Sequence, residues 1–322
     1  MTEDAPHDGE LHVGDASERA TFEKGAALVD MSGMLLLLCE GSPSAAFGPA
    51  VLAGPTLNVG SCALEAVLLG DGFLASVPLA ARTGDNELLI IDPTPRSDLL
   101  LSWLEFVSHI EQGGVRPYEG LTLKDESDSL VPFVLAGHEA TATLADYVPE
   151  GQCLPEAGQV VNLDLDGRIT TISMRPDLPG DTLYVLLVPP SHSRVIWRSL
   201  LSFPLVCPVG REILASRLQK RISILSLLDK TDRIRVESER LSAAGVLRTG
   251  SDFIGARGLR EGSRTYRVAT PREPKMSYPL GCGVRFVPQD RLGTSPERET
   301  TDMSRPTVGA TVTGEANHAL RL

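Results

Sequence analysis

The first ninety residues contain several short apolar runs, each bounded by Gly, Pro, Asn, Asp or Ser. The runs occupy residues 34–40, 56–70, 72–82 and 86–92. Apolar runs of this length that end in turn-forming residues are typical of β-strands rather than helices. The pattern therefore predicts a β-rich region over residues 25–92.

A helical period replaces the strand pattern after residue 97. Asp98 is suited to the N-cap position, and the Gly-Gly pair at 113–114 would end the helix. The predicted helix covers residues 98–112. Its apolar stripe consists of Leu99, Leu100, Trp103, Leu104, Val107 and Ile110.

Residues 129–190 again contain strand-like runs. The string VVNLDLDGRITTISM at 160–174 alternates apolar and polar positions on either side of the Asp-Gly pair at 166–167. An Asp-Gly pair between alternating runs is a strong signal for a β-hairpin. A further strand is predicted at 182–188, and the two prolines that follow would end it.

Residues 209–245 form the main predicted helical segment. Apolar side chains recur there at helical spacing, and Gly245 follows a second predicted helix at about 231–244. Short strands are predicted near 264–269 and 283–287. The helical stripe consists of Ile213, Leu214, Leu218, Ile222, Leu225 and Leu228.

These elements predict an α+β fold: a β-rich trunk and an intermediate β domain, with a helical segment near 209–245 and flexible termini. No internal repeat is visible. The predicted organisation has five parts: a flexible acidic arm at 1–20, a β-rich trunk with one helix at 21–128, a second β-rich region at 129–208, a helical segment with closing strands at 209–288, and an extended polar tail at 289–322.

The composition is typical of a soluble globular protein. Of the 322 residues, 42% are hydrophobic and 22% are charged. No apolar run approaches the roughly 18 residues that a membrane helix needs. The acidic, polar start lacks the basic-then-apolar order of a signal peptide. We therefore expect a protein of the cytosol or nucleus.

Charge is distributed unevenly along the chain, whose net charge is −12. Residues 1–190 hold 8 basic and 29 acidic residues, whereas residues 191–300 hold 20 basic and 11 acidic residues. Such polarity suits contacts between neighbouring subunits or a basic face turned toward nucleic acid, but it also fits ordinary solvated helix faces. Any nucleic-acid contact through 191–300 is expected to be non-specific, because the aromatic residues there are too dispersed for a stacking platform.

Cysteines and histidines are scattered rather than clustered. No C-x-x-C pair is present, and we expect buried free thiols and no zinc site. His109, His138 and His192 are each isolated, and the other histidines lie in the predicted arms. The remaining residues of these types are His7, His12, His318, Cys39, Cys62, Cys153, Cys207 and Cys282.

Sequence motifs for catalysis are also absent. The chain has no G-x-S-x-G, no phosphate-binding glycine loop and no G-x-G-x-x-G pattern. Asp164, Asp166 and Gly167 lack the spacing of a calcium loop, and a hairpin accounts for them. We therefore predict no catalytic, cofactor-binding or metal-binding residues, no cofactor and no enzymatic activity.

Four pieces of the chain stand in the order seen in one viral protein family. They are GDTLYVLLVPP at 180–190, SFPLVCPVGREILASRL at 202–218, ISILSLLD at 222–229 and GSRTYRV at 262–268. An apolar strand ending in two prolines, further prolines and a helix opening with Glu-Ile together resemble the herpesvirus triplex capsid protein, specifically the subunit present in two copies per triplex. The prolines before the helix would hold the chain extended.

The chain departs from that family in three respects. The spacing from Glu212 to Leu218 is one residue longer, the part before the double proline is longer, and the C-terminal part is much shorter. The short C-terminal part puts in doubt the helical domain through which the two like subunits of the family join.

The resemblance implies a structural minor capsid protein that bridges major capsid subunits as part of a heterotrimeric triplex. Its partners would be the major capsid protein, a second triplex subunit and a second copy of itself, without membrane contact. Its location would be the virion capsid and, during assembly, the host nucleus. Two alternatives stay open: a decoration or surface protein of another virus or phage, and a nucleotide-related enzyme-derived domain.

Overall fold

The fold is α+β, as the sequence predicts, and it contains two large sheets that face each other. The computed structural model describes residues 15–230, 232–261, 266–268, 283–284, 286–288 and 310–311, with side chains between residues 20 and 260. Within these residues, no helix combines the length and the apolar character that crossing a membrane requires.

The six-stranded sheet has the order β10-β11-β12-β9-β1-β13. Its ladders are antiparallel except at one edge, where β13 runs parallel to β1. Every residue of β12 is buried, as expected for a strand that is covered on both faces. The strands are β1 (Ala26–Asp30), β9 (Val131–Ala136), β10 (Gln159–Leu165), β11 (Ile169–Arg175), β12 (Leu183–Val188) and β13 (Val206–Pro208).

The five-stranded sheet has the order β3-β6-β7-β2-β8 and is antiparallel throughout. Its strands are β2 (Leu35–Glu40), β3 (Cys62–Leu64), β6 (Leu79–Gly84), β7 (Glu87–Asp92) and β8 (Thr122–Asp125). A separate pair, β4 (Val67–Leu68) and β5 (Leu74–Ser76), lies between β3 and β6 in the chain.

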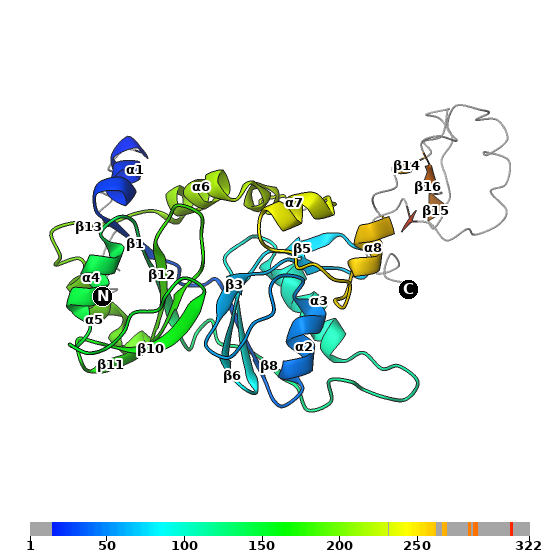
Figure 1. The fold of residues 1–322 in the computed structure, drawn as a ribbon, viewed down its shortest axis with the longest axis horizontal. Helices are drawn as coiled ribbons and strands as arrows, with labels where there is room; N and C mark the ends of the chain where they lie inside the picture. The colour runs from blue at the N-terminus through cyan, green and yellow to red at the C-terminus, as the bar shows by residue number, and fades with distance from the viewer. Residues whose placement is uncertain are drawn as a thin grey trace, which may run out of the picture.

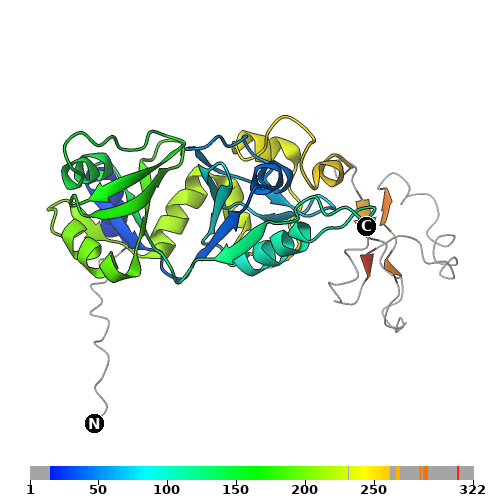
Figure 2. The same ribbon diagram turned by 90° about the horizontal axis from the view of Figure 1, so that it is seen from below.

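Helices cover the outer face of each sheet, and a shared core fills the space between the inner faces (Figure 1, Figure 2). Helices α2 (Ser44–Val51) and α3 (Ser97–Ser108) pack on the five-stranded sheet, while α4 (Ala140–Tyr147) and α5 (Pro190–Leu200) pack on the six-stranded sheet. The core between the inner faces of the two sheets is called the central core below. Alternate residues of β2 point to opposite faces of its sheet: Leu36 packs in the central core, and Leu37 packs in the core between the five-stranded sheet and its helices.

The segment that follows the six-stranded sheet crosses the top of both sheets in Figure 1. It contains α6 (Arg211–Arg221), a short 3₁₀ helix η1 (Ser223–Leu227), α7 (Ser238–Ala243) and α8 (Ala256–Glu261). Helix α1 (Asp15–Lys24) lies next to α6 and β1. The segment covers the central core with Leu214, Ile222, Ile224, Leu228 and Leu241.

The hairpin predicted at the Asp-Gly pair is confirmed. Strands β10 and β11 pair from Gln159 with Arg175 to Leu165 with Ile169. Asp166 and Gly167 both have positive φ, 54° and 65°. This conformation is the one that a two-residue hairpin turn needs, because its twist matches that of the two strands.

Five α-helices of the described residues were not expected from the sequence: α1, α2, α4, α5 and α8. Helix α2 contains Pro49, and α4 is short, so neither shows a sustained helical period. The prolines at 189–190 do end a strand, as predicted, but Pro190 then occupies the first turn of α5. Proline is well placed there because its missing N–H has no helical partner at that position.

The predicted helices also differ in length from the observed ones. Helix α3 ends at Ser108 rather than 112, and a bridge between Gln112 and Val115 follows. The segment 209–245 is broken, because Ile222 has φ −123° and ψ 87°, outside the helical region. Ile222 is instead buried against the central core, so packing interrupts the helix that the spacing predicts.

The two sheets do not follow the predicted division at residue 128. Strand β1 pairs with β9 and β13, so it belongs to the sheet otherwise built from residues 131–208. Residues 15–20 of the predicted arm lie in α1, and residues 1–14 lie outside the described part. Short strands β14 (Tyr266–Val268), β15 (Gly283–Val284), β16 (Phe286–Pro288) and β17 (Ala310–Thr311) follow, and most of the predicted tail lies outside the described residues.

Candidate functional site

The structure does not bring the predicted isolated histidines together. The ring of His109 lies at the end of α3 with Nδ1 2.8 Å from the Glu105 carbonyl oxygen, and His192 contacts its neighbour Ser191. The side chain of His138 is 74% exposed. Within the described residues, no three His, Cys, Asp or Glu side chains are grouped as metal ligands would be. His7, His12 and His318 lie outside the described part.

The described cysteines are free thiols, and the Asp-rich turn is part of the β10–β11 hairpin. Cys39 and Cys62 are buried free thiols, and burial raises the pKa of each to about 12. Cys153 and Cys207 are free but exposed, contrary to the expectation of burial, while Cys282 lies outside the described residues. Asp164 accepts hydrogen bonds from Thr170 Oγ1 (2.6 Å) and Gln152 Nε2 (2.9 Å), so its carboxylate serves the hairpin.

A cleft of about 310 Å³ opens between the inner faces of the two sheets. This volume falls at the lower end of the range, roughly 300–1,000 Å³, of small-molecule sites. Six lining residues are apolar and four are polar. The lining residues are Leu38, Leu89, Leu130, Val160, Val161, Ile172, Thr83, Glu87, Glu126 and Asn162.

The strand periodicity explains why a cleft forms at this place. Side chains two residues apart share a face, so Ile91, Leu89 and Glu87 lie in a row on β7. Ile91 and Leu89 belong to the central core, whereas Glu87 is exposed. On β10, buried Val160 is followed on the same face by exposed Asn162. The apolar core therefore ends in a cleft with an apolar floor and a polar rim.

One wall of the cleft is a segment, residues 126–130, that connects the two sheets. Residues 126–130 join β8 to β9, and their backbone is fixed to β2. The N–H of Glu126 donates to the Leu36 carbonyl (2.7 Å), and the N–H of Leu36 donates to Ser127 Oγ (3.1 Å). These bonds hold Glu126 and Leu130 beside the cleft.

A second set of backbone bonds joins the sheets at the other wall. The N–H of Cys62 donates to the Gly158 carbonyl (2.8 Å), and the N–H of Val160 donates to the Gly60 carbonyl (2.9 Å). Strand β10 therefore continues into the five-stranded sheet through the Ser61–Gln159 bridge. The spacing of the two cleft walls is thus set by main-chain hydrogen bonds.

The polar groups of the cleft carry spare hydrogen-bonding capacity. Glu87 Oε2 accepts one hydrogen bond, from Thr83 Oγ1 at 3.2 Å. Within the described residues, the side chains of Glu126 and Asn162 make no hydrogen bond or ion pair. No lining residue is cationic. Lys124, which feels the charge of Glu126, is ion-paired with Glu40.

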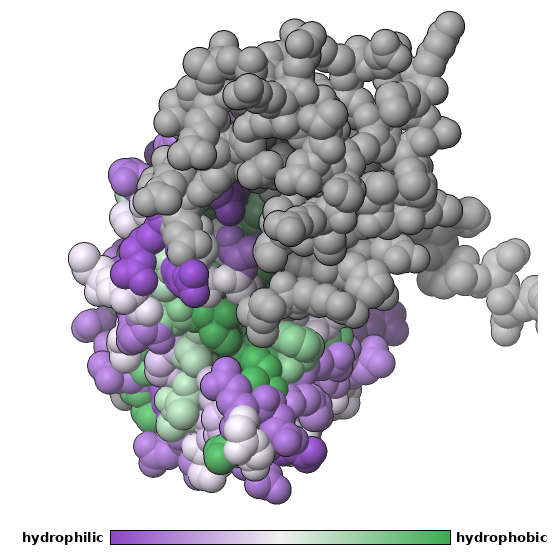
Figure 3. Space-filling view, turned by 90° about the vertical axis from the view of Figure 1, so that its right-hand side faces the viewer, coloured by the Kyte–Doolittle hydropathy of each residue, from purple (hydrophilic) through white to green (hydrophobic). Residues whose placement is uncertain are grey.

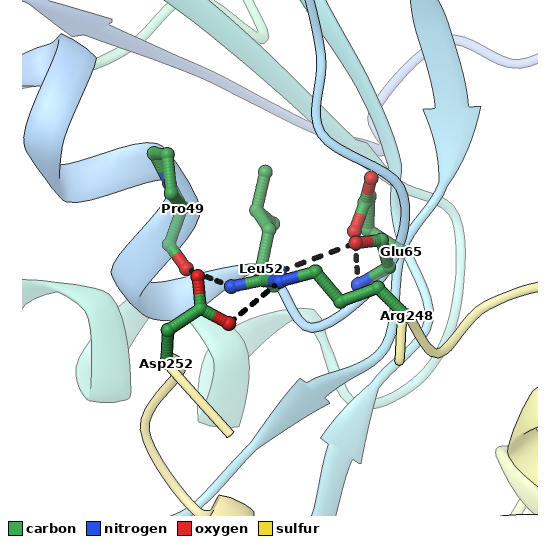
Figure 4. A network of polar contacts seen from close by, with 6 residues as sticks. Pro49, Leu52, Glu65, Arg248 and Asp252 are labelled. Atoms are coloured by element: carbon green, nitrogen blue, oxygen red, sulfur yellow. Dashed lines mark hydrogen bonds and ion pairs between the residues drawn. The ribbon is translucent and has the colours of Figure 1, made fainter. Parts of the chain in front are cut away.

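Two further acidic residues are buried away from this cleft. Burial raises the pKa of Glu65 to about 8, although the Gly54 N–H and the Arg248 charge act in the opposite direction. Arg248 holds the chain around Glu65, because it donates to the carbonyls of Pro49, Leu52 and Gly54 (Figure 4). The network joins the 248–252 segment to the end of α2.

The second buried acid, Asp92, lies in a similar network at the end of β7. Burial raises the pKa of Asp92, while hydrogen bonds from Ser76 and Thr94 and the charge of Arg96 lower it. The Arg96 guanidinium donates to the carbonyls of Leu74, Ala75, Lys230 and Asp232. It therefore ties the segment after η1 to the five-stranded sheet.

Two other surface features are poorer candidates for a ligand site. A hollow of about 20 Å³ between α2 and Arg248 has room for about one water molecule. On α3, Leu99 and Phe106 are 39% and 48% exposed. Figure 3, which views the molecule from the right-hand side of Figure 1, shows apolar surface among polar residues. Nothing in the described residues indicates what would bind there.

Comparison with known proteins identifies a fold but no sequence family. Neither a protein-family model nor a curated protein matches the chain. Among solved structures, glycine cleavage system aminomethyltransferase T from Bartonella henselae matches 78% of this chain and 66% of its own, with 18% identity and a TM-score of 0.56. The chain thus spans about two thirds of that enzyme's length, and the likeness shows an aminomethyltransferase T-type fold.

A second structure is less similar. Heterotetrameric sarcosine oxidase from Corynebacterium sp. U-96, in complex with pyrrole 2-carboxylate, matches 68% of this chain and 94% of its own chain. The identity is 15% and the TM-score is 0.40.

These findings overturn the resemblance to the herpesvirus triplex protein and the capsid function that followed from it. The fold resembles that of aminomethyltransferase T, which is an enzyme, and this likeness contradicts the expectation of a non-enzymatic structural protein. The sequence pieces that suggested the triplex protein are ordinary elements of this fold. Residues 183–188 are an inner strand of the six-stranded sheet and 211–221 are a covering helix, an arrangement that many α+β proteins share. The enzyme-derived alternative agrees with the fold, and the expected capsid partners and virion location depended on the resemblance alone.

Proposed function

We propose that this chain is a group-transfer enzyme of the aminomethyltransferase type, and that its substrate binds in the cleft between the two sheets. The fold carries this proposal, because 78% of the chain superposes on aminomethyltransferase T. The cleft supports it, because both sheets of that fold contribute its walls and its volume suits a small molecule.

The reaction requires positioning more than redox chemistry. An aminomethyl group moves from a donor to an acceptor thiol or amine; the carbon's bond to the donor breaks and its bond to the acceptor forms. The acceptor's proton passes to the donor, so no oxidant or reductant is consumed. An apolar floor with carboxylates at its rim would hold the two reactants together and limit access of water.

The test is transfer of a labelled group. The purified full chain is incubated with a panel of ¹³C-labelled aminomethyl donors and with thiol and amine acceptors, and the acceptors are analysed by mass spectrometry. Ile172→Trp should fill the cleft and abolish transfer, because Ile172 forms part of the lining. Val195→Trp, at an exposed position on α5, is the matched control and should retain transfer.

Both variants are checked for folding by thermal unfolding. If the wild-type chain moves no label to any acceptor, the proposed function is wrong. Transfer that survives in folded Ile172→Trp would place the substrate elsewhere.

A further inference from the structure

The cleft combines an apolar floor with acidic groups and lacks cationic ones. We infer that its ligand is a small primary ammonium compound with an apolar body, and that the negative charges of Glu87 and Glu126 attract its ammonium group to the cleft. This inference deepens the proposed function, since it rests on the cleft being the substrate site.

The two carboxylates reach the cleft from different parts of the chain. Glu87 begins β7 in the five-stranded sheet, and Glu126 stands on the segment that connects the sheets. Two negative charges at one cleft attract a cation and repel an anion. The charge of the lining therefore selects against carboxylate, phosphate and sulfate ligands, and favours a cation over a neutral molecule of the same shape.

The free acceptors favour a primary ammonium group over a quaternary one. A primary ammonium group has three N–H donors. The cleft offers carboxylate oxygens of Glu87 and Glu126 and the side-chain carbonyl of Asn162, and the last two have no hydrogen-bond partner within the described residues. Thr83 donates to Glu87 and so fixes the orientation of that carboxylate.

The floor determines the rest of the ligand. Leu38 and Leu89 are paired across the β2–β7 ladder, and Val160 and Ile172 face them from the six-stranded sheet. Contact with these side chains removes apolar ligand surface from water, which favours a hydrocarbon body. A ligand with charges at both ends would lose this contribution.

Four compounds of similar shape separate these contributions: 2-phenylethylammonium, its N,N,N-trimethyl derivative, 2-phenylethanol and phenylacetate. Their affinities for the full chain are measured by isothermal titration calorimetry. We expect the primary ammonium compound to bind most tightly and phenylacetate most weakly. Glu87→Gln and Glu126→Gln should each weaken binding of the ammonium compound roughly fivefold, the upper range for a partly exposed ion pair, and leave 2-phenylethanol unchanged.

Glu105→Gln, which removes an exposed carboxylate from α3, is the matched control for net charge and should bind all four compounds as wild type does. Thermal unfolding confirms that each variant is folded. Equal affinities for the ammonium compound and the alcohol, no binding of any compound, or unchanged binding in both glutamine variants would overturn the inference. Selective binding without any group transfer would contradict the proposed function alone, whereas transfer without selectivity for the cation would contradict the inference alone.

Discussion

Two pairs of acidic residues in this protein stand in opposite surroundings. Glu65 and Asp92 are fully buried, each near an arginine, whereas Glu87 and Glu126 line the cleft between the sheets. Burial raises the pKa of both buried carboxyls. In this protein the carboxyls with a raised pKa, Glu65 and Asp92, belong to buried hydrogen-bond networks that hold the fold together. The carboxylates that suit a ligand, Glu87 and Glu126, are accessible and have few or no hydrogen-bond partners.

The largest effect is expected in the pH dependence of stability. The pKa of Glu65 is about 8 in the folded chain against an ordinary value of 4.5, so the folded state holds a proton that the unfolded state has lost between these values. The free energy of unfolding should therefore fall as pH rises from 4.5 to 8, by at most about 5 kcal/mol, and then level off.

Urea unfolding of the wild-type chain and of Glu65→Gln at several pH values between 4.5 and 9 measures this effect. The variant should lose the Glu65 part of the pH dependence, since glutamine does not titrate. Glu105→Gln should keep it. Equal slopes in wild type and Glu65→Gln would show that Glu65 is ionised in the folded state and that the buried pair is not distinct.

A somewhat smaller loss is expected when the arginine beside Glu65 is removed. Arg248→Met leaves the carbonyls of Pro49, Leu52 and Gly54 without their donor and should lower the free energy of unfolding by about 3 kcal/mol. Arg240→Met, at an exposed position on α7, should change it by less than about 0.5 kcal/mol. Urea titration at one pH measures both. Equal stability of the two variants would mean that the network contributes little.

The smallest effect on stability is expected at the cleft. Glu87→Gln and Glu126→Gln should each change the free energy of unfolding by less than about 0.5 kcal/mol, because neither carboxylate is buried and Gln keeps the shape of the side chain. The same urea titration applies. A loss as large as that of Arg248→Met would place these acids among the structural groups and remove the contrast with the buried pair.

Sequence motifs could not identify the candidate site, because its residues are far apart in the sequence. Catalytic and metal motifs are local in sequence, whereas the cleft residues come from β2, β6, β7, β10, β11 and the 126–130 segment. One signal was present. Glu87 and Asn162 are polar residues at strand positions whose neighbours two residues away, Leu89 and Val160, are buried. The alternation showed that these strands have two faces but not that their faces meet.

The sequence by itself determined the elements that depend on near neighbours. The alternation of apolar and polar residues, together with the Asp-Gly pair, predicts the β10–β11 hairpin, and apolar residues at helical spacing predict most of α3. Both elements can be predicted because their patterns depend on residues only a few positions apart. The same local logic overestimated the helix after residue 209, where burial of Ile222 interrupts it.

Only the tertiary structure decided which elements meet. Strand β1 pairs with β13 through Ala26 and Val206, although 179 residues lie between them. Arg248 reaches the carbonyls around residue 52, and the connecting segment brings Glu126 to the same cleft as Glu87. A carboxylate has the same chemistry in any sequence; whether it becomes a buried, neutral group or an accessible anion depends on what the folded chain places around it.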